Sequence, residues 1–207
     1  PQPNTSALPA PRTILNTGRS GGFTKISSLT GGSGTNIFTL RGSGNLSGTL
    51  TGGSGTNTLV ANNVTNTWTV NASNAGSLAG VNGVGSFVSI QNLNGGTGAD
   101  TFNFSGAGAI SGSVNGGGGA GVNTLSYAAL TSPVNITLSG SGSNSGFAGS
   151  ATGGTSGSFN NINVLNGSTT GVSTLTASNS ANTWTISGSN AGTLAATNSL
   201  AFTSFKN

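Results

Sequence analysis

The chain has 207 residues, among them one acidic residue, no His, no Cys, no Met and 38 Gly, and its formal net charge is +4. General acid–base catalysis, Ser–His–Asp or Cys–His nucleophiles, and zinc, copper or iron sites all need side chains that are absent here or too few. The high pI near 11.0 reflects missing acids rather than clustered Lys and Arg, so nucleic acid is not an expected partner. We predict a protein that is not an enzyme and uses no cofactor.

The composition also bears on location. No run approaches the roughly 20 apolar residues that span a bilayer, so membrane insertion is not expected. Abundant Gly, Ser, Thr and Asn with few Lys and Glu is unusual for a cytosolic domain. We expect an extracellular protein, secreted or on the cell surface.

Residues 1–20 hold four of the five prolines. Proline cannot donate a hydrogen bond to a β-ladder, so this stretch is predicted to be an extended leader or a segment that pairs along a sheet edge. The run from Arg12 to Asn16 suits such pairing. The remainder, residues 21–207, is predicted to form one repeat domain.

Repeats dominate residues 21–207. Gly-Gly pairs begin at positions 31, 52, 95 and 116, and the tract around Trp68 recurs 116 residues later around Trp184. Between the glycines lie short β-branched segments that are too short for helices, such as Thr67–Val70, Phe87–Ile90 and Val134–Leu138. These features predict an all-β fold, a parallel β-solenoid of the β-helix or β-roll type with coils of about 21 residues. A flexible low-complexity chain is the rival interpretation, which the regular apolar register disfavours.

Two kinds of position repeat within the predicted coils. Apolar residues that keep register are expected to point inward and stack; those singled out are Phe38, Leu59, Trp68, Phe102, Leu125, Leu175 and Trp184. Polar residues that end the Gly-rich turns are expected to form an amide ladder along the stack; these are Asn36, Asn57, Asp100 and Asn123.

The repeats N-L-x-G-G-x-G-x-D/N-x-F/L, N-T-W-T-V/I and SYAALTSPVNITLSG (126–140) resemble the β-strand repeats of large secreted bacterial proteins. They are similar to the calcium-binding β-rolls of RTX, or haemolysin-type, proteins and to filamentous-haemagglutinin-like adhesins. The resemblance implies an exported solenoid passenger or stalk segment without catalytic residues. It covers almost all of residues 21–207.

The stretch GGTGADTFN (95–103) fits the nonapeptide pattern of calcium-binding β-rolls. Calcium takes six to eight oxygen ligands, several of them charged. Asp100 is the sole acid, and the equivalent turns carry Asn. Asp100 is thus a weak metal candidate, and we predict that it serves turn geometry with no bound metal.

The expected function is that of an extracellular structural protein, a solenoid rod in a fibre, stalk or matrix. Its expected partner is the protein itself, through end-to-end strand addition or as part of a longer chain of similar repeats. The alternative is an adhesin module that binds glycan or another surface through a Thr/Asn-rich face.

Overall fold

The protein is all-β in a computed structural model that describes residues 13–16, 25–80, 82–152 and 157–206. These residues include no helix long and apolar enough to cross a membrane. Their strands form two sheets, each with parallel and antiparallel pairs, so the sheets are mixed.

The nine-stranded sheet contains, in spatial order, β1 (Thr13–Asn16), β3 (Ile37–Leu40), β5 (Thr58–Val60), β9 (Asn92–Asn94), β11 (Ser113–Asn115), β15 (Ser158–Ile162), β14 (Phe147–Thr152), β13 (Asn135–Ser141) and β17 (Thr174–Thr176). The eleven-stranded sheet contains, in spatial order, β18 (Thr183–Gly188), β19 (Ala191–Ala195), β20 (Ser199–Thr203), β16 (Val164–Asn166), β12 (Thr124–Ala129), β10 (Thr101–Ser105), β6 (Thr67–Ala72), β7 (Ala75–Ala79), β8 (Val84–Val88), β4 (Leu46–Thr51) and β2 (Leu29–Thr30).

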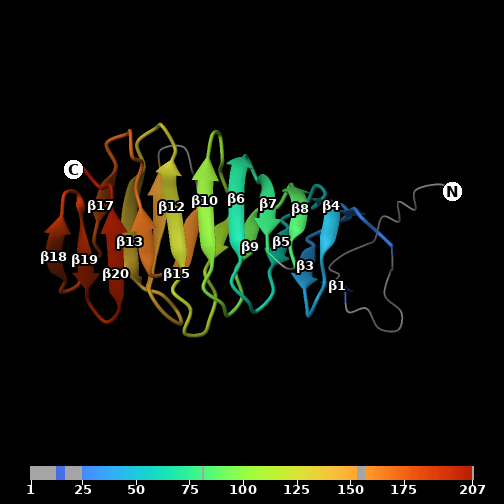
Figure 1. Cartoon of the computed structure of the whole chain (residues 1–207), viewed down its shortest axis with the longest axis horizontal. Coiled ribbons are helices and arrows are strands. Elements are labelled where there is room, and N and C mark those ends of the chain that lie inside the picture. The colour runs from blue at the N-terminus through green and yellow to red at the C-terminus, as the bar shows by residue number, and fades with distance from the viewer. Residues whose placement is uncertain (1–12, 17–24, 81, 153–156, 207) are drawn as a thin grey trace.

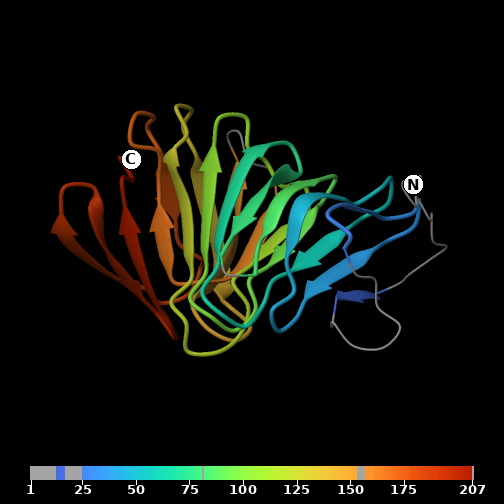
Figure 2. The same ribbon diagram turned by 45° about the vertical axis from the view of Figure 1, so that its right-hand side comes forward.

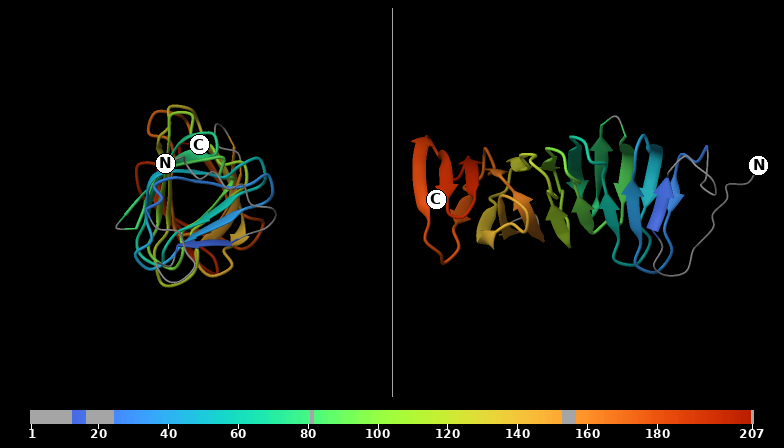
Figure 3. Two further views of the ribbon diagram at one scale, coloured as in Figure 1. Left: turned by 90° about the vertical axis from the view of Figure 1, so that its right-hand side faces the viewer. Right: turned by 90° about the horizontal axis from the view of Figure 1, so that it is seen from below.

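The chain passes back and forth between the two sheets as it advances. For example, β3 lies in the nine-stranded sheet, β4 in the eleven-stranded sheet and β5 in the nine-stranded sheet again. Figure 1 shows the strands side by side along the longest axis, with β1 near one end and β18 at the other. Figure 2 and the right view of Figure 3 show the same elongated arrangement from other sides, and the left view of Figure 3 looks along the long axis.

The predicted period of about 21 residues holds for only part of the chain. Ile37 pairs with Thr58, and Leu93 pairs with Val114, both at the predicted spacing. Thr67 pairs instead with Thr101. The spacing is larger there because the chain between these two strands also forms β7 and β8.

An arrangement that is parallel throughout is also incorrect, because β7, β14 and β19 run antiparallel to both of their neighbours. Short turns explain two of these reversals. Asn74 and Asn190 adopt left-handed conformations, with φ of 52° and 57°, between β6 and β7 and between β18 and β19. Asn tolerates this region well, and a tight turn returns the chain beside the strand that it has just left.

Within the predicted leader, β1 pairs in parallel with β3 at the edge of the nine-stranded sheet. The rest of residues 1–20 lies outside the described residues. Residues 21–24 lie outside them as well.

One apolar core joins the two sheets. In the nine-stranded sheet, residues in register form a buried row of Phe38, Leu59, Leu93, Val114 and Phe159. In the eleven-stranded sheet, the corresponding row is Trp68, Phe102, Leu125, Leu165 and Phe202. Burial of each large apolar side chain stabilises the fold by about 1.5–3 kcal/mol, so these rows carry much of the stability.

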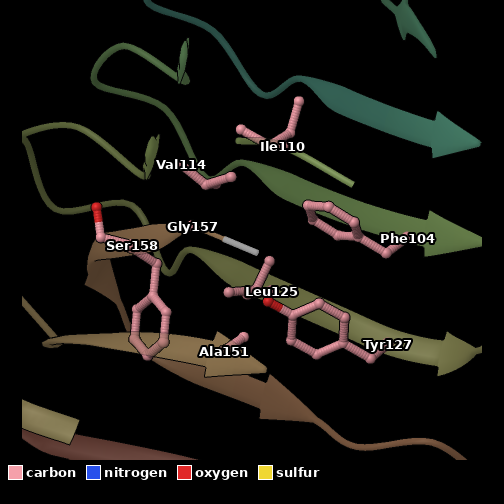
Figure 4. Close-up of a pocket in the computed structure, with 9 residues that line it drawn as sticks. Phe104, Ile110, Val114, Leu125, Tyr127, Ala151, Gly157 and Ser158 are labelled. Atoms are coloured by element: carbon pink, nitrogen blue, oxygen red, sulfur yellow. The ribbon is translucent and has the colours of Figure 1, made fainter. Parts of the chain in front are cut away.

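The core is closed around Leu125. Figure 4 shows Phe104 and Tyr127 of the eleven-stranded sheet and Val114 and Ala151 of the nine-stranded sheet facing one shared space. The void between them measures only about 10 Å³. That is about the space that one water molecule needs, so a ligand has no room there.

Candidate functional site

The polar residues that end the turns lie directly before the strands. Asn36 and Asn57 precede β3 and β5, and Asn66, Asp100 and Asn123 precede β6, β10 and β12. All five are at most 5% exposed. Burial of amides and a carboxyl group is unfavourable unless hydrogen bonds replace those made to water.

Glycines make room for these side chains at the turns. A Cβ atom on Gly52 would collide with the Ser89 carbonyl oxygen and with Nδ2 of Asn57. The next residue, Gly53, has φ of 90°, which favours glycine. The Gly-Gly pair therefore lets neighbouring turns approach closely enough to share hydrogen bonds.

Asn36, Asn57 and Gln91 form the first amide row, on the turns that lead into the nine-stranded sheet. The backbone N–H of Asn36 donates to Oδ1 of Asn57 over 3.1 Å, and Nδ2 of Asn36 donates to the same oxygen over 2.9 Å. The backbone N–H of Asn57 donates in turn to Oε1 of Gln91 over 2.7 Å. The side-chain oxygens of Asn57 and Gln91 thus each accept a hydrogen bond from the backbone of the neighbouring turn.

Asn66, Asp100, Asn123 and Asn163 form the second amide row, on the turns that lead into the eleven-stranded sheet. Oδ1 of Asp100 accepts from the backbone N–H of Asn66 over 3.0 Å and from its Nδ2 over 2.7 Å. The backbone N–H of Asp100 donates to Oδ1 of Asn123, and that of Asn123 donates to Oδ1 of Asn163, both over 3.0 Å.

The predicted ladder residues therefore separate into two rows. Asn36 bonds directly to Asn57, and Asp100 bonds directly to Asn123. No single ladder joins all four residues, because the two pairs lie in turns that precede strands of different sheets. Sequence reasoning missed Asn66, whose turn ANNVTN lacks the Gly-Gly pair; the signal that marks it is Asn directly before the strand TWTV.

The second carboxylate oxygen of Asp100 distinguishes its turn from the others. In Asn36 and Asn57, Nδ2 donates to carbonyl oxygens of its own and the neighbouring turn, over 2.7–3.4 Å. Asp100 has Oδ2 in place of Nδ2, and both this oxygen and the Gly116 carbonyl oxygen lie beside the position that a Cβ atom on Gly95 would occupy. This buried oxygen has no hydrogen-bond partner. An acceptor thus occupies a position that otherwise holds a donor.

The surroundings of Asp100 favour its protonated form. Burial raises the pKa of the Asp100 carboxyl from 3.8 to about 6, and the hydrogen bonds from Asn66 oppose this rise. A protonated Oδ2 would become a donor and match the pattern of the Asn residues.

The same geometry bears on calcium. The chain holds no second acidic side chain, and the described residues contain no cluster of three or more His, Cys, Asp or Glu side chains. In the equivalent turns, the amide nitrogen already lies at hydrogen-bond distance from the carbonyl oxygens. Calcium needs six to eight oxygens at about 2.3–2.6 Å, several of them charged.

The predicted core residues are buried with one exception. Phe38, Leu59, Trp68, Phe102, Leu125 and Leu175 are all at most 6% exposed. Trp184, which was expected to stack in the same way, is 41% exposed. The reason is its place on β18, the terminal strand of the eleven-stranded sheet, which has a described neighbour on one side only.

β18 thus forms an open sheet edge. All six of its residues are exposed, and no Lys, Arg or Pro interrupts it. Natural sheet edges are usually blunted by charge, proline or shortness, because unpaired backbone groups invite another strand. This edge therefore offers a binding surface that no described residue covers.

No family model, curated protein or solved structure matches this chain. The resemblance to RTX-type and haemagglutinin-like repeats therefore remains a prediction.

Proposed function

We propose that the protein is a β-solenoid rod that serves as an extracellular structural element of a fibre, stalk or matrix. In this proposal each coil consists of a strand from each sheet, and some coils carry an added antiparallel hairpin. The rod has no catalytic role. It assembles with other copies of itself or continues into similar repeats.

The observation that carries the proposal is the stacking of like positions along the long axis. Backbone hydrogen bonds, two apolar rows and two amide rows all run in that direction, from strand to strand and from turn to turn. Such an arrangement resists extension because each coil contacts the next through backbone hydrogen bonds, apolar packing and amide hydrogen bonds. The scarcity of charge also leaves little repulsion between stacked ends.

Small-angle X-ray scattering tests the rod directly. A compact globular protein of 207 residues has a radius of gyration of about 17 Å. The eleven strands of the longer sheet span only about 50 Å at about 4.8 Å per strand, so the radius of gyration of the monomer stays close to the globular value. The pair-distance distribution separates the two shapes, and we expect an asymmetric curve with its maximum at short distances and a long tail. A symmetric, bell-shaped curve would rule out the proposed shape.

Negative-stain electron microscopy tests assembly. We expect particles that lengthen along one axis as concentration rises, with little change between low and high salt, since few charges take part. Aggregates without a common width would contradict the structural role.

A glycan-binding adhesin module is the second candidate, favoured by one surface feature. A hollow of about 500 Å³ is lined in part by Thr39, Arg41, Asn62 and Asn63. Hydroxyl, amide and guanidinium groups suit sugar hydroxyls. Retention on a glycan array that is lost in Arg41→Ala, with the rod shape kept, would favour this function.

A further inference from the structure

The open edge of β18 has an internal counterpart in which the same edge is covered. β6, β7 and β8 pair in the same way as β18, β19 and β20, with Trp68 opposite Leu78 and Trp184 opposite Leu194. The outer edge of β6, however, pairs in parallel with β10. β6 is therefore an example, within the same molecule, of such an edge covered by a parallel strand.

Burial differs sharply between the two edges. Trp68 and Val70 on β6 are fully buried, whereas Trp184 and Ile186 on β18 are 41% and 69% exposed. The Trp68 ring stacks on Phe102 of β10 with ring centres 5.5 Å apart, and it contacts Phe87 edge-on. Trp184 keeps only the edge-on contact, with Phe202.

The turns before β6 and β18 differ in the same way. Asn66 bonds within its own turn to Asn62 and Val64, and it also bonds outward to Gly95 and to Asp100 of the next coil. Asn182 makes the two bonds within its own turn, to Ser178 and Ser180. Its Oδ1 is buried without a partner.

The core is also open at this end. Leu175, Trp184, Ile186, Phe202 and Phe205 line a hollow of about 420 Å³ beside the edge. These side chains come from the last strands of both sheets and the segment that follows β20. One further coil would close it.

The strands at the two ends of the molecule point the same way. In the eleven-stranded sheet the successive parallel and antiparallel pairs make β2 parallel to β18. In the nine-stranded sheet they make β1 parallel to β17. A second copy in the same orientation therefore presents strands of the required direction to both sheets at once.

We propose that the β17–β18 end of one copy binds the β1–β2 end of a second copy, by parallel strand addition in both sheets. Leu29 is the core-facing residue of β2, since it is in register with the buried Leu50. In the complex Leu29 lies beside Trp184, as Phe102 lies beside Trp68, and Thr30 lies beside Thr185. This head-to-tail contact leaves the outer ends free to repeat it, which gives an open filament. The inference rests on the proposed rod and specifies its joint.

Tryptophan fluorescence in the full chain provides the first test. Trp68 is already buried, so the quencher-accessible emission of the monomer comes from Trp184. We expect acrylamide quenching to fall and the emission to shift to the blue as concentration rises. Ile186→Lys places a charge on the edge strand and should abolish both changes while the monomer stays folded, because residue 186 is exposed there.

Val122→Lys is the matched control. Val122 is 58% exposed in the turn before β12, away from both ends, so the same charge on a similar residue should leave the transition unchanged. Equal effects of the two variants would overturn the assignment of the joint to β18.

Cysteine trapping tests the register, because the chain has no cysteine of its own. Neighbouring strands lie about 4.8 Å apart, within the Cα separations that a disulfide spans. Thr30→Cys and Thr185→Cys, made separately and mixed under mild oxidation, should give the mixed dimer in preference to either homodimer. Preferential self-pairing of Thr185→Cys would instead establish a tail-to-tail contact and overturn the proposal.

The experiments also distinguish a failure of the proposed joint from a failure of the proposed rod. A monomer that scatters as a rod but keeps Trp184 quenchable at millimolar concentration and forms no mixed dimer would overturn the joint alone. A globular scattering profile would overturn the rod. Filaments that persist in Ile186→Lys would retain the structural role but place the joint on another surface.

Discussion

Asp100 differs from the other turn residues by one atom, and that atom determines how its turn responds to pH. Oδ2 replaces the amide nitrogen that donates hydrogen bonds in the Asn residues, and it is buried without a hydrogen-bond partner. Its pKa is raised from 3.8 to about 6 by burial. The folded state therefore holds this proton more tightly than the unfolded state, and stability falls as pH rises through that interval.

Asp100→Asn should stabilise the protein at pH 7. The substitution restores a donor and removes the buried charge, and we expect a gain of about 1–3 kcal/mol in the free energy of unfolding. Lowering the pH from 7 to 4 should raise the free energy of unfolding of the wild type, whereas that of the variant should change less. Denaturant melts at both pH values measure this; a variant less stable than wild type at pH 7 would indicate that the carboxylate has a stabilising partner.

Asn57→Asp is the reciprocal change in the first amide row. Nδ2 of Asn57 donates to the carbonyl oxygens of Gly55 and Ser89, over 2.7 and 3.0 Å. Replacement by a carboxylate should create the conflict found at Asp100, with a loss of about 1–3 kcal/mol at pH 7 that diminishes toward pH 4. A loss that is independent of pH would refute the account of Asp100 as well.

The strands β6 and β18 show how a nearly identical sequence acquires different roles. Both contain Thr-Trp-Thr, and both turn back through Ser-Asn-Ala-Gly into an antiparallel neighbour. One is covered by β10 and the other lies at an open edge. The energetic weight of each tryptophan therefore depends on the neighbouring strand and not on the local sequence.

Alanine substitution at the two tryptophans should separate these roles. Trp68→Ala removes a fully buried ring and should destabilise the monomer by about 3–5 kcal/mol. Trp184→Ala should reduce monomer stability by less than about 1 kcal/mol, since its ring is partly solvated and lacks a stacking partner. Far-UV circular dichroism during denaturant unfolding at low concentration gives both values, and similar losses would contradict the difference in packing.

Along the whole molecule, each strand and turn is held chiefly by its spatial neighbours. Stability is then close to a sum over coils and their interfaces, without one central site. A bound metal is not needed to hold the turns, because Asn donors already connect them in both amide rows.

Chelation should therefore leave the protein unchanged. We expect the same thermal midpoint with excess EDTA and with millimolar calcium, because a ligand that binds neither the folded nor the unfolded state cannot shift the equilibrium between them. Parallel melts of Asp100→Asn provide the control. A midpoint that calcium raises in wild type and not in the variant would show a metal site at Asp100.

Much of the turn chemistry was predictable, and its connectivity was not. Asn36 and Asn57 were recognisable as partners because an equal Gly-Gly motif precedes both and their turns are 21 residues apart. The bond between Asn66 and Asp100 joins residues 34 apart whose turns share little sequence. The β6–β7 hairpin lies between them, so a constant period places Asp100 in the wrong row.

Local chemistry was enough to indicate the all-β class, the inward apolar positions and the polar residues that end the turns. Each follows from a few neighbouring residues: β-branched alternation, glycines that permit close turns, and amides that replace solvent. The tertiary structure decided which strands became neighbours, where the sheets became antiparallel, and that Trp68 is buried while Trp184 lies open. Those outcomes depend on contacts between residues far apart in the chain, and equal local sequences carry no record of which strand, if any, lies beside them.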